Sequence, residues 1–462
     1  MWGVFWLGSV GMRHGRPVAV GGRRVSCAVS ARMPVTFAEG HTGVAMISFF
    51  FSGMDRTFRT YLELLRRPGA ARPAAGTALG SLPIGMLGLS VLLLVQRSTG
   101  RFAAAGAVVG LLALGTGVGI LAQGRLIDRF GPPRVLLPAV ALQLPALLAL
   151  VLAARASAGM WTLGSMALVA GACEPQVGGS LRGLWSVLAP AEQRQAAIAL
   201  SSTLFEVALV TGPLLLVAVL AVTGPAGGVL ASGACFTAGT LLLTSSAACR
   251  SWRPARRPAA GAGADLLGAL ANPGMRTLTW VAAVQGTAVG LVQVASVAIA
   301  AQHGALSWAP WCTAALSTGS MVGTIAYGSH RWRIVPARRI ACLLMLLALV
   351  SAMTAIAPTM PALLAALLVA GLVLGPVLVT CFTLVDHFAP TGTLVGGFTT
   401  LTAAGLGATA AGNAAAGWLV ERASPPLALL AAAIAALAGA ALTLLRRASL
   451  GSPPHRASPP PG

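Results

Sequence analysis

The stretch Gly124-Arg-Leu-Ile-Asp128-Arg129-Phe-Gly131-Pro-Pro-Arg134 is short, charged and rich in glycine and proline. It lies between two apolar runs, residues 103–123 and 135–153. Each run approaches the roughly 20 residues that an α-helix needs to cross the hydrocarbon core of a bilayer. The glycines permit a tight reversal of the chain, and Asp128 can face a helix N-terminus or an arginine. The stretch therefore predicts two membrane-spanning helices joined by a short turn at the membrane surface.

The composition extends this prediction to the whole chain. Of its 462 residues, 56% are hydrophobic and 9% are charged, and the mean hydropathy is +0.82. Soluble domains carry roughly 25% charged residues. All 31 basic residues are arginine and the formal charge is +21, which in a soluble protein would suggest nucleic acid. Because the arginines fall mostly between apolar runs, we interpret them as topology signals and expect no nucleic-acid partner.

Apolar segments of membrane-spanning length recur along the chain. They predict an all-α membrane protein with twelve transmembrane helices, in two pseudo-symmetric six-helix bundles. The predicted spans are 76–95, 103–123, 135–153, 160–188, 196–222, 226–248, 276–301, 308–328, 339–357, 361–385, 393–420 and 427–445.

The distribution of arginine orients these spans. Short cytoplasmic loops collect positive charge, and one alternating set of connections holds 21 arginines. The other set holds four: Arg97, Arg101, Arg155 and Arg422. Both termini are therefore predicted to be cytoplasmic. The absence of lysine and the abundance of alanine and glycine suggest a GC-rich bacterial genome, so we expect a multi-pass protein of a bacterial cell (inner) membrane.

The polar segments divide the chain. The first 53 residues fit the pattern poorly, and we expect either an upstream misassigned start, with Met54 as the true beginning, or a disordered extension. The predicted segments are 1–53, this extension; 54–75, a cytoplasmic N-terminal segment; 76–248, the first bundle; 249–274, a cytoplasmic central loop; 275–447, the second bundle; and 448–462, a disordered cytoplasmic tail.

The two predicted bundles share residues at a common offset of 200. Five residues of the first recur in the second: Gly171, Leu184, Ala189, Pro190 and Gly212 recur as Gly371, Leu384, Ala389, Pro390 and Gly412. The matches fall at equivalent points of the fourth and fifth spans of each half. They predict a duplicated six-helix unit.

The stretch 124–134 resembles the loop 2–3 signature of the major facilitator superfamily, G-x-L-x-D-R-x-G-x-R/K. With the predicted spans, the resemblance covers roughly residues 74–447. In that family the loop helps to hold the two halves together on the cytoplasmic side in one transport state. The resemblance implies this role for Gly124, Asp128, Arg129, Gly131 and Arg134. A second copy, Gly328 to Arg338, keeps the charge but lacks the acid, and we interpret it as a positive-inside anchor.

A second, partial resemblance lies in the fifth predicted span. Glu206 to Pro213 is similar to the antiporter motif G-x-x-x-G-P-x-x-G-G of the family's drug exporters, but it keeps only the core Gly212-Pro213. This favours the bacterial drug or metabolite efflux branch. The alternative interpretation is a proline kink that packs this helix against its neighbour.

Two acids fall deep inside predicted spans, Glu174 and Glu206, out of ten in the chain. An isolated ionised carboxylate costs roughly 2.5–3.5 kcal/mol there even on lenient scales. Counting residues along antiparallel helices puts Arg182 within reach of Glu206. One hypothesis is that Glu206 or Glu174 takes up and releases a proton while Arg182 alters its affinity. The other is a permanent Arg182–Glu206 ion pair, with Glu174-Pro175 marking a helix bend.

The second half offers amides in place of acids. Gln285 and Gln293 lie in the seventh span and Asn413 in the eleventh, and Gly375-Pro376 interrupts the tenth. Amides can hydrogen-bond a substrate in a midplane cavity, so these three are substrate-cavity candidates. The alternative is that they bond neighbouring helices.

The sequence contains neither a phosphate-binding loop nor HExxH or GxSxG, so we expect no enzyme activity and no cofactor. The seven cysteines lie far apart without CxxC, so we expect no metal site. We predict a monomeric secondary active transporter for proton-coupled efflux of a small, moderately apolar solute. Its partners are then the solute, protons and the lipid bilayer. The alternatives are an uptake permease or uniporter, or a non-transporting permease-like sensor.

Overall fold

The structure, a computed structural model, describes residues 61–190, 193–251, 270, 272–328, 334–357, 359–388 and 394–450. Every regular element in these ranges is a helix. This agrees with the composition, because a backbone in lipid must satisfy its own hydrogen bonds. The predicted N-terminal extension, most of the central loop and most of the C-terminal tail lie outside the described residues.

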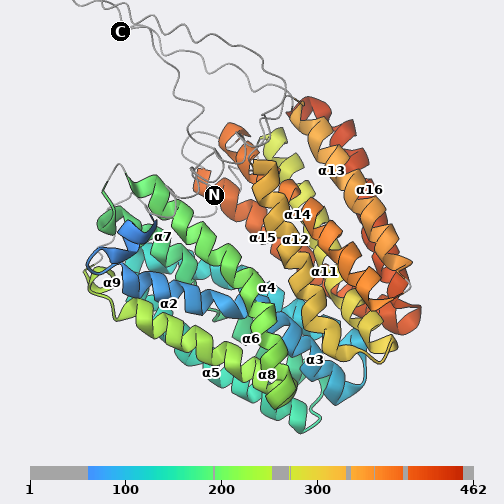
Figure 1. The fold of residues 1–462 in the computed structure, drawn as a ribbon, viewed down its shortest axis with the longest axis horizontal. Helices are drawn as coiled ribbons and strands as arrows, with labels where there is room; N and C mark the ends of the chain where they lie inside the picture. Colours follow the sequence, from blue (N-terminus) through green and yellow to red (C-terminus); the bar gives the residue numbers. More distant parts are fainter. Residues whose placement is uncertain are drawn as a thin grey trace, which may run out of the picture.

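The helices form two bundles that lie side by side (Figure 1). The first contains α2 (Ala71–Ser81), η1 (Leu82–Gly85), α3 (Leu87–Thr99), α4 (Phe102–Phe130), α5 (Pro132–Arg155), α6 (Met160–Ala172), α7 (Val177–Leu188), α8 (Arg194–Thr244) and α9 (Ala247–Arg250). The second contains α11 (Pro273–Gln302), η3 (Leu306–Trp308), α12 (Ala309–Gly328), α13 (Pro336–Ala355), α14 (Met360–Phe388), α15 (Leu394–Arg422), α16 (Pro425–Leu445) and η4 (Arg447–Leu450).

Prolines alter the helix boundaries predicted from apolar length. The span 76–95 is divided by the short 3-10 helix η1, which contains Pro83. The span 160–188 is two helices, α6 and α7, because the chain leaves the helix before Pro175. Conversely, the spans 196–222 and 226–248 share α8, whose backbone is non-helical only at Gly224, with φ 66° and ψ −171°, just before Pro225.

Eight helices of the described part are long and apolar enough to cross a membrane. They are Ala71–Thr99, Phe102–Ile127, Pro132–Arg155, Leu200–Thr244, Pro273–Gln302, Pro336–Ala355, Met360–Val385 and Pro425–Leu445. Four of the twelve predicted spans have no such helix of their own. The span 160–188 is split into two helices, and the span 226–248 shares α8 with the span before it. The spans 308–328 and 393–420 lie in α12 and α15, and these two helices are not among the eight. The chain is therefore a multi-pass helical membrane protein by length and composition.

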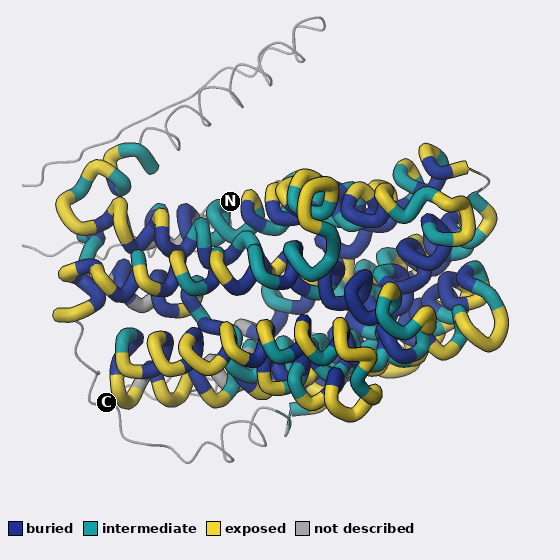
Figure 2. Tube along the Cα trace, turned by 90° about the horizontal axis from the view of Figure 1, so that it is seen from below, coloured by how far each residue is buried: buried dark blue, intermediate teal, exposed yellow. Residues whose placement is uncertain are grey.

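Exposed residues lie on the outer faces of the bundles and buried residues lie between helices (Figure 2). Many of the exposed residues are large and apolar. Leu142 on α5, Leu349 on α13 and Ile434 on α16 are all more than half exposed. Exposing so many large apolar side chains to water would cost free energy. They suit a surface that faces lipid.

Equivalent helix contacts recur in the two bundles. In the first, a β-carbon on Gly171 of α6 would meet the Leu112 carbonyl of α4. In the second, a β-carbon on Gly371 of α14 would meet the Leu316 carbonyl of α12. The backbones of α4 and α6, and of α12 and α14, therefore approach each other at glycines 200 residues apart.

The bundles meet along α4 and α15, which run antiparallel. Near the start of α4 the contact is backbone to backbone. A β-carbon on Gly106 would meet the Asn413 carbonyl, and a β-carbon on Gly110 would lie 2.7 Å from the Ala410 carbonyl oxygen. Further along α4, Gly117 reaches only the side chain of Leu406, and a β-carbon on Gly124 would meet nothing within 4 Å. The two helices therefore touch at one end and separate toward the other.

Candidate functional site

Glu174 lies in the break between α6 and α7 and is half-buried. Its Oε2 is 2.9 Å from Thr116 Oγ1 on α4, and the same hydroxyl is 3.1 Å from the Leu112 carbonyl. A hydroxyl has one proton and can donate to one of these acceptors at a time. The site therefore has room for a second proton, which a protonated Glu174 would donate to Thr116.

Gln123 of α4 holds the break itself. Its Nε2 donates to the Ala172 carbonyl at 3.0 Å and to the Glu174 carbonyl at 2.8 Å, and its Oε1 accepts from the backbone N–H of Gln176 at 3.3 Å. These are backbone groups that lose their helical partners at a break. Gln123 is only 5% exposed, so a buried side chain of the neighbouring helix α4 satisfies the backbone groups at the break.

Thr116 and Gln123 contact the break that contains Glu174, and sequence analysis did not identify either of them. A usable signal existed: Gly115, Gly119 and Gln123 are spaced by four, which places them on one helix face. The glycines bring α4 against Leu168 and Ala172 of α6, and the amide follows on the same face.

Glu206 lies on α8 with a half-buried side chain. No hydrogen bond or ion pair reaches its carboxylate from the described side chains. Arg182 lies in α7, but its side chain is outside what the structure describes, so the Arg182–Glu206 pairing stays a prediction. A nearby contact fixes the register of these helices: Trp185 Nε1 donates to Ser201 Oγ at 2.7 Å.

The amide candidates of the second half lie at helix contacts. Gln285 is 8% exposed and its Nε2 donates to the Leu374 carbonyl of α14 at 2.8 Å. Asn413 is 1% exposed, where α4, α11 and α15 meet. Gln285 Oε1 and Asn413 Oδ1 are buried without a partner among the described atoms. Gln293 is half-buried on α11.

The contact between Gln285 and the Leu374 carbonyl has a counterpart in the first half, where Gln123 donates to the Glu174 carbonyl. Glu174 and Leu374 are 200 residues apart, which is the offset between the two halves. In both halves, a glutamine from another helix donates to this carbonyl, which lies one residue before Pro175 in the first half and two residues before Pro376 in the second. The helix breaks at Pro175 but stays continuous through Pro376. The donors differ, since Gln123 belongs to α4 and Gln285 to α11.

The switch-loop candidates lie at the junction of α4 and α5. The predicted loop is mostly helix, because α4 continues to Phe130 and Gly131 alone makes the reversal, with φ 87°. Only glycine adopts such a φ readily. Gly124, Arg129 and Arg134 are exposed, and the Asp128 side chain lies outside the description.

Gly212 and Pro213 of the antiporter-like motif pack on η1. A β-carbon on Gly212 would meet the Leu82 carbonyl, and one on Gly85 would lie 2.6 Å from Pro213 Cδ. The motif thus brings α8 against the interrupted first span.

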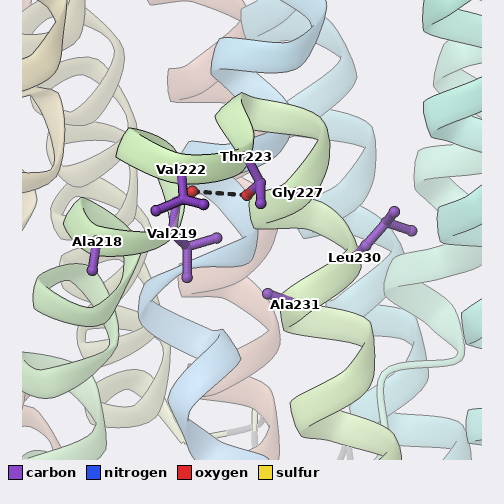
Figure 3. Close-up of a pocket in the computed structure, with 7 residues that line it drawn as sticks. All are labelled: Ala218, Val219, Val222, Thr223, Gly227, Leu230 and Ala231. Atoms are coloured by element: carbon purple, nitrogen blue, oxygen red, sulfur yellow. Dashed lines mark hydrogen bonds between the residues drawn. The ribbon is translucent and has the colours of Figure 1, made fainter.

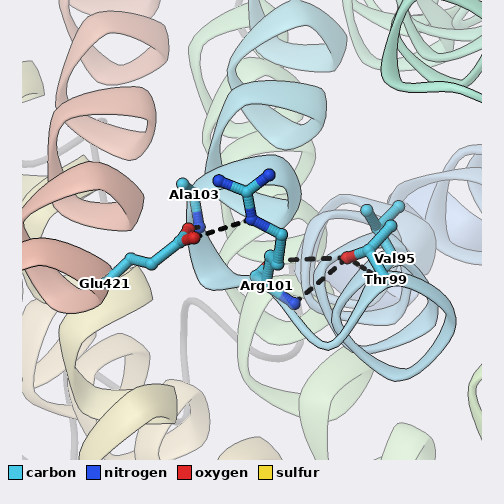
Figure 4. Close-up of polar contacts among 5 residues, drawn as sticks. All are labelled: Val95, Thr99, Arg101, Ala103 and Glu421. Atoms are coloured by element: carbon cyan, nitrogen blue, oxygen red, sulfur yellow. Dashed lines mark hydrogen bonds and ion pairs between the residues drawn. The ribbon is translucent and has the colours of Figure 1, made fainter.

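An ion pair joins the two bundles at the end where α4 and α15 touch. Arg101 Nε donates to Glu421 Oε1 at 2.6 Å, and the Ala103 N–H donates to Glu421 Oε2 at 3.1 Å (Figure 4). Glu421 thereby neutralises Arg101 and caps the N-terminus of α4 from the opposite bundle. Sequence analysis placed Arg101 in a connection between predicted spans but did not pair it with an acid.

The comparisons with known proteins agree on the fold. The sequence matches the profile of the Major Facilitator Superfamily over residues 74–409, and no curated protein sequence matches. Similar solved structures include the nucleoside transporter NupG (TM-score 0.63, 13% identity, covering 81% of this chain and 99% of that one).

Two bacterial structures described as inward-facing are also similar. One is a homologue of the human lysosomal transporter Spinster (TM-score 0.64, 13% identity, 85% and 98% covered). The other is a homologue of the iron transporter ferroportin (TM-score 0.65, 15% identity, 82% and 98% covered). At such identities the likeness concerns the fold. Because the family profile covers well over half of the sequence, the chain belongs to the major facilitator superfamily and is a transporter rather than an enzyme.

Proposed function

We propose that this transporter exports a small, moderately apolar solute in exchange for protons, by alternating access. The observation that carries the proposal is Glu206, a half-buried carboxylate on α8 that no described side chain pairs. A carboxylate at membrane depth is costly when ionised and unpaired, so its protonation state is expected to follow its access to water.

The register of α7 and α8 supports a partner for Glu206. With Trp185 bonded to Ser201 and the helices antiparallel, Arg182 lies opposite residue 204 or so, about 3 Å along the axis from Glu206. A swing of the long arginine side chain covers that offset. We infer that Arg182 approaches Glu206 in one transport state and displaces its proton.

Glu174 is the second proton site in this proposal. When Glu174 is ionised, the Thr116 hydroxyl can donate to its carboxylate or to the Leu112 carbonyl. When Glu174 is protonated, its carboxyl group donates to the Thr116 hydroxyl, which in turn donates to the Leu112 carbonyl. Both protonation states of Glu174 therefore have a complete hydrogen-bond arrangement without movement of the backbone.

We also propose twelve crossings with both termini in the cytoplasm of a bacterial inner membrane. The bend at Gly224 divides α8 into two legs, and α6 with α7, α12 and α15 supply the remaining crossings beyond the apolar set. The arginine-rich connections then lie on the side where α4 and α15 separate. The conformer is accordingly closed outside and open to the cytoplasm, the state in which an exporter loads its solute.

Export is favoured over import by two features. Gly212-Pro213 keeps the core of an exporter motif, and ionisable side chains are rare at depth, so the transport path suits a moderately apolar solute. The amides Gln285, Gln293 and Asn413 are candidates to orient its polar groups.

The test is solute-induced proton movement in proteoliposomes, over a panel of lipophilic cations, antibiotics and sugars. Glu206→Gln is expected to abolish gradient-driven transport while keeping solute exchange at zero gradient, because only the coupling step needs the titrating group. Glu174→Gln is measured in parallel. Glu63→Gln, at an exposed acid of the N-terminal segment, is the matched control.

The remaining functions are outcomes of the same assay. Solute flux without proton movement in the unaltered protein would replace the proposal by a uniporter. Proton-driven accumulation on the side opposite to that expected would indicate an uptake permease. Absence of flux for every compound would favour a permease-like sensor.

A further inference from the structure

The bend in α8 creates an apolar groove at the closed end of the transporter. Gly224, with its positive φ, turns the chain back, and Pro225 starts the second leg. Residues from both legs line this open groove, whose volume is about 570 Å³ (Figure 3). The lining residues are Ala218, Val219, Val222, Thr223, Gly227, Leu230 and Ala231.

The groove has no polar group free to orient a polar solute. Its single hydroxyl, on Thr223, already donates to the Val219 carbonyl at 2.7 Å. Ala218, Gly227 and Ala231 are small, which leaves the space between the legs unfilled. Val222 at its mouth is 84% exposed, so the groove opens on the outer face of the protein rather than into the bundle.

A cation lies close to this groove, beside Gly224, the residue that follows the lining residue Thr223. Arg97, in the last turn of α3, places Nη1 3.6 Å from the point where a β-carbon on Gly224 would lie. The Arg97 side chain is exposed, and no described residue forms an ion pair with it. By contrast, Arg101, four residues later, is occupied by Glu421.

Tryptophans place this end of the molecule at the level of lipid headgroups. Exposed tryptophans occur near the ends of α6, α12 and α15 that lie on the same side as Arg97: Trp161, Trp308, Trp311 and Trp418. Tryptophan collects at the membrane–water interface. From Gly224 to Ala218 the groove runs about 9 Å along the helix axis, which takes it from the headgroup level into the acyl-chain region.

We propose that this groove binds one net-anionic glycerophospholipid, with its phosphodiester on Arg97 and one acyl chain between the legs of α8. The occupant has to be anionic at one end and apolar over the rest, because the site offers one unpaired cation and an apolar wall. A membrane lipid is the one ligand of that chemistry always present at this depth.

Photocrosslinking tests the proposal on the full-length protein in nanodiscs. The probe is phosphatidylglycerol with a photoreactive acyl chain, in a phosphatidylcholine background, and peptide mass spectrometry locates the adducts. We expect adducts to concentrate in residues 218–231, several-fold above the lipid-facing surface of α5 around Leu142 and Leu148. Even labelling of both surfaces would overturn the proposal.

Two pairs of matched variants test the headgroup contact and the acyl-chain contact separately. Arg97→Gln should lower the preference for phosphatidylglycerol over phosphatidylcholine about fivefold, as expected for one arginine at the membrane surface, while Arg155→Gln, an exposed arginine at the same end, should not. Ala218→Phe should fill the groove and remove the adducts, whereas Ala221→Phe, exposed but outside the lining, should keep them.

Three results would overturn the inference: unchanged headgroup preference in Arg97→Gln, adducts that persist in Ala218→Phe, or displacement of the probe by inorganic phosphate. The last would show a free-anion site. None of these depends on solute transport, so the test separates this site from the proposed exporter activity.

Discussion

Glu421 on α15 accepts a hydrogen bond from Arg101 at 2.6 Å and another from the first turn of α4, across 320 residues of sequence. The pair lies where the two bundles touch. It therefore exists only in conformations in which this end is closed, and breaking it biases the transporter toward opening there.

Glu421→Gln should shift the population modestly toward the state open at this end. The side chains are 66% and 29% exposed, so water screens the pair, and we expect roughly 1 kcal/mol, or about a fivefold change in the ratio of states. Distances between spin labels on the two bundles measure this ratio. Arg101→Gln should have a similar effect, and the double variant should add little to either. Additive effects would show that the two residues do not act as a pair.

Gly417→Ala should shift the population in the same direction as Glu421→Gln but for a steric reason, because a larger side chain obstructs closure itself. A β-carbon there would meet the Phe102 carbonyl of α4, whereas one on Gly407 of the same helix would meet nothing within 4 Å. Overpacking typically costs 1–3 kcal/mol. The same spin-label distances should show depletion of the closed state in Gly417→Ala and no change in Gly407→Ala. Equal distances in both variants would refute close packing of α4 and α15.

Gln123→Ala should destabilise the protein, since the Ala172 carbonyl loses its side-chain donor and the Gln176 N–H loses its acceptor. The Glu174 carbonyl keeps only the donation from Gln176 Nε2, at 3.1 Å. Each buried unsatisfied group costs roughly 1–3 kcal/mol, so the unfolding temperature in detergent should fall clearly. Gln285→Ala should cost less, because it frees one carbonyl and also removes an unpaired buried Oε1. Gln302→Ala, exposed at the end of α11, is the control. A ranking with Gln285→Ala as the most damaging would contradict the role given to Gln123.

The Cys249 thiol should resist alkylation until the protein unfolds. It lies in α9, beyond the last apolar turn of α8, and burial raises its pKa to about 11. At pH 8 roughly 0.1% would then be thiolate, the reactive form. Its reaction with N-ethylmaleimide, followed by peptide mass spectrometry, should be slow, rise steadily from pH 8 to 10, and accelerate sharply in denaturant. Equal rates in folded and denatured protein would show that Cys249 is accessible.

Most of the fold was readable from the sequence because it depends on length, apolarity and charge. The stretch 124–134 identified the family, and the offset linking Gly171 with Gly371 has a physical counterpart in equivalent helix contacts. Boundaries were less predictable where prolines act. Apolarity alone cannot show that Pro175 breaks a helix while Pro376 does not, because the outcome depends on how neighbouring helices satisfy the freed backbone groups.

The candidate site was predictable only in its rarest residues. Glu174 and Glu206 were identified because acids are exceptional inside apolar spans. Thr116 and Gln123 are ordinary residues in sequence, and their importance comes from the glycine contacts that bring α4 against α6. Arg101 and Glu421 were visible as charges, but pairing them requires the antiparallel register of two helices from different halves.

The bend at Gly224 also affects how the protein is made. It joins two apolar legs with no charged residue between Glu206 and Arg250, so the insertion machinery has no hydrophilic segment to translocate between them. We expect both legs to leave the ribosome and enter the bilayer together as one helical hairpin. The bend would thus spare the growing chain the slow step of passing a charged loop through the membrane.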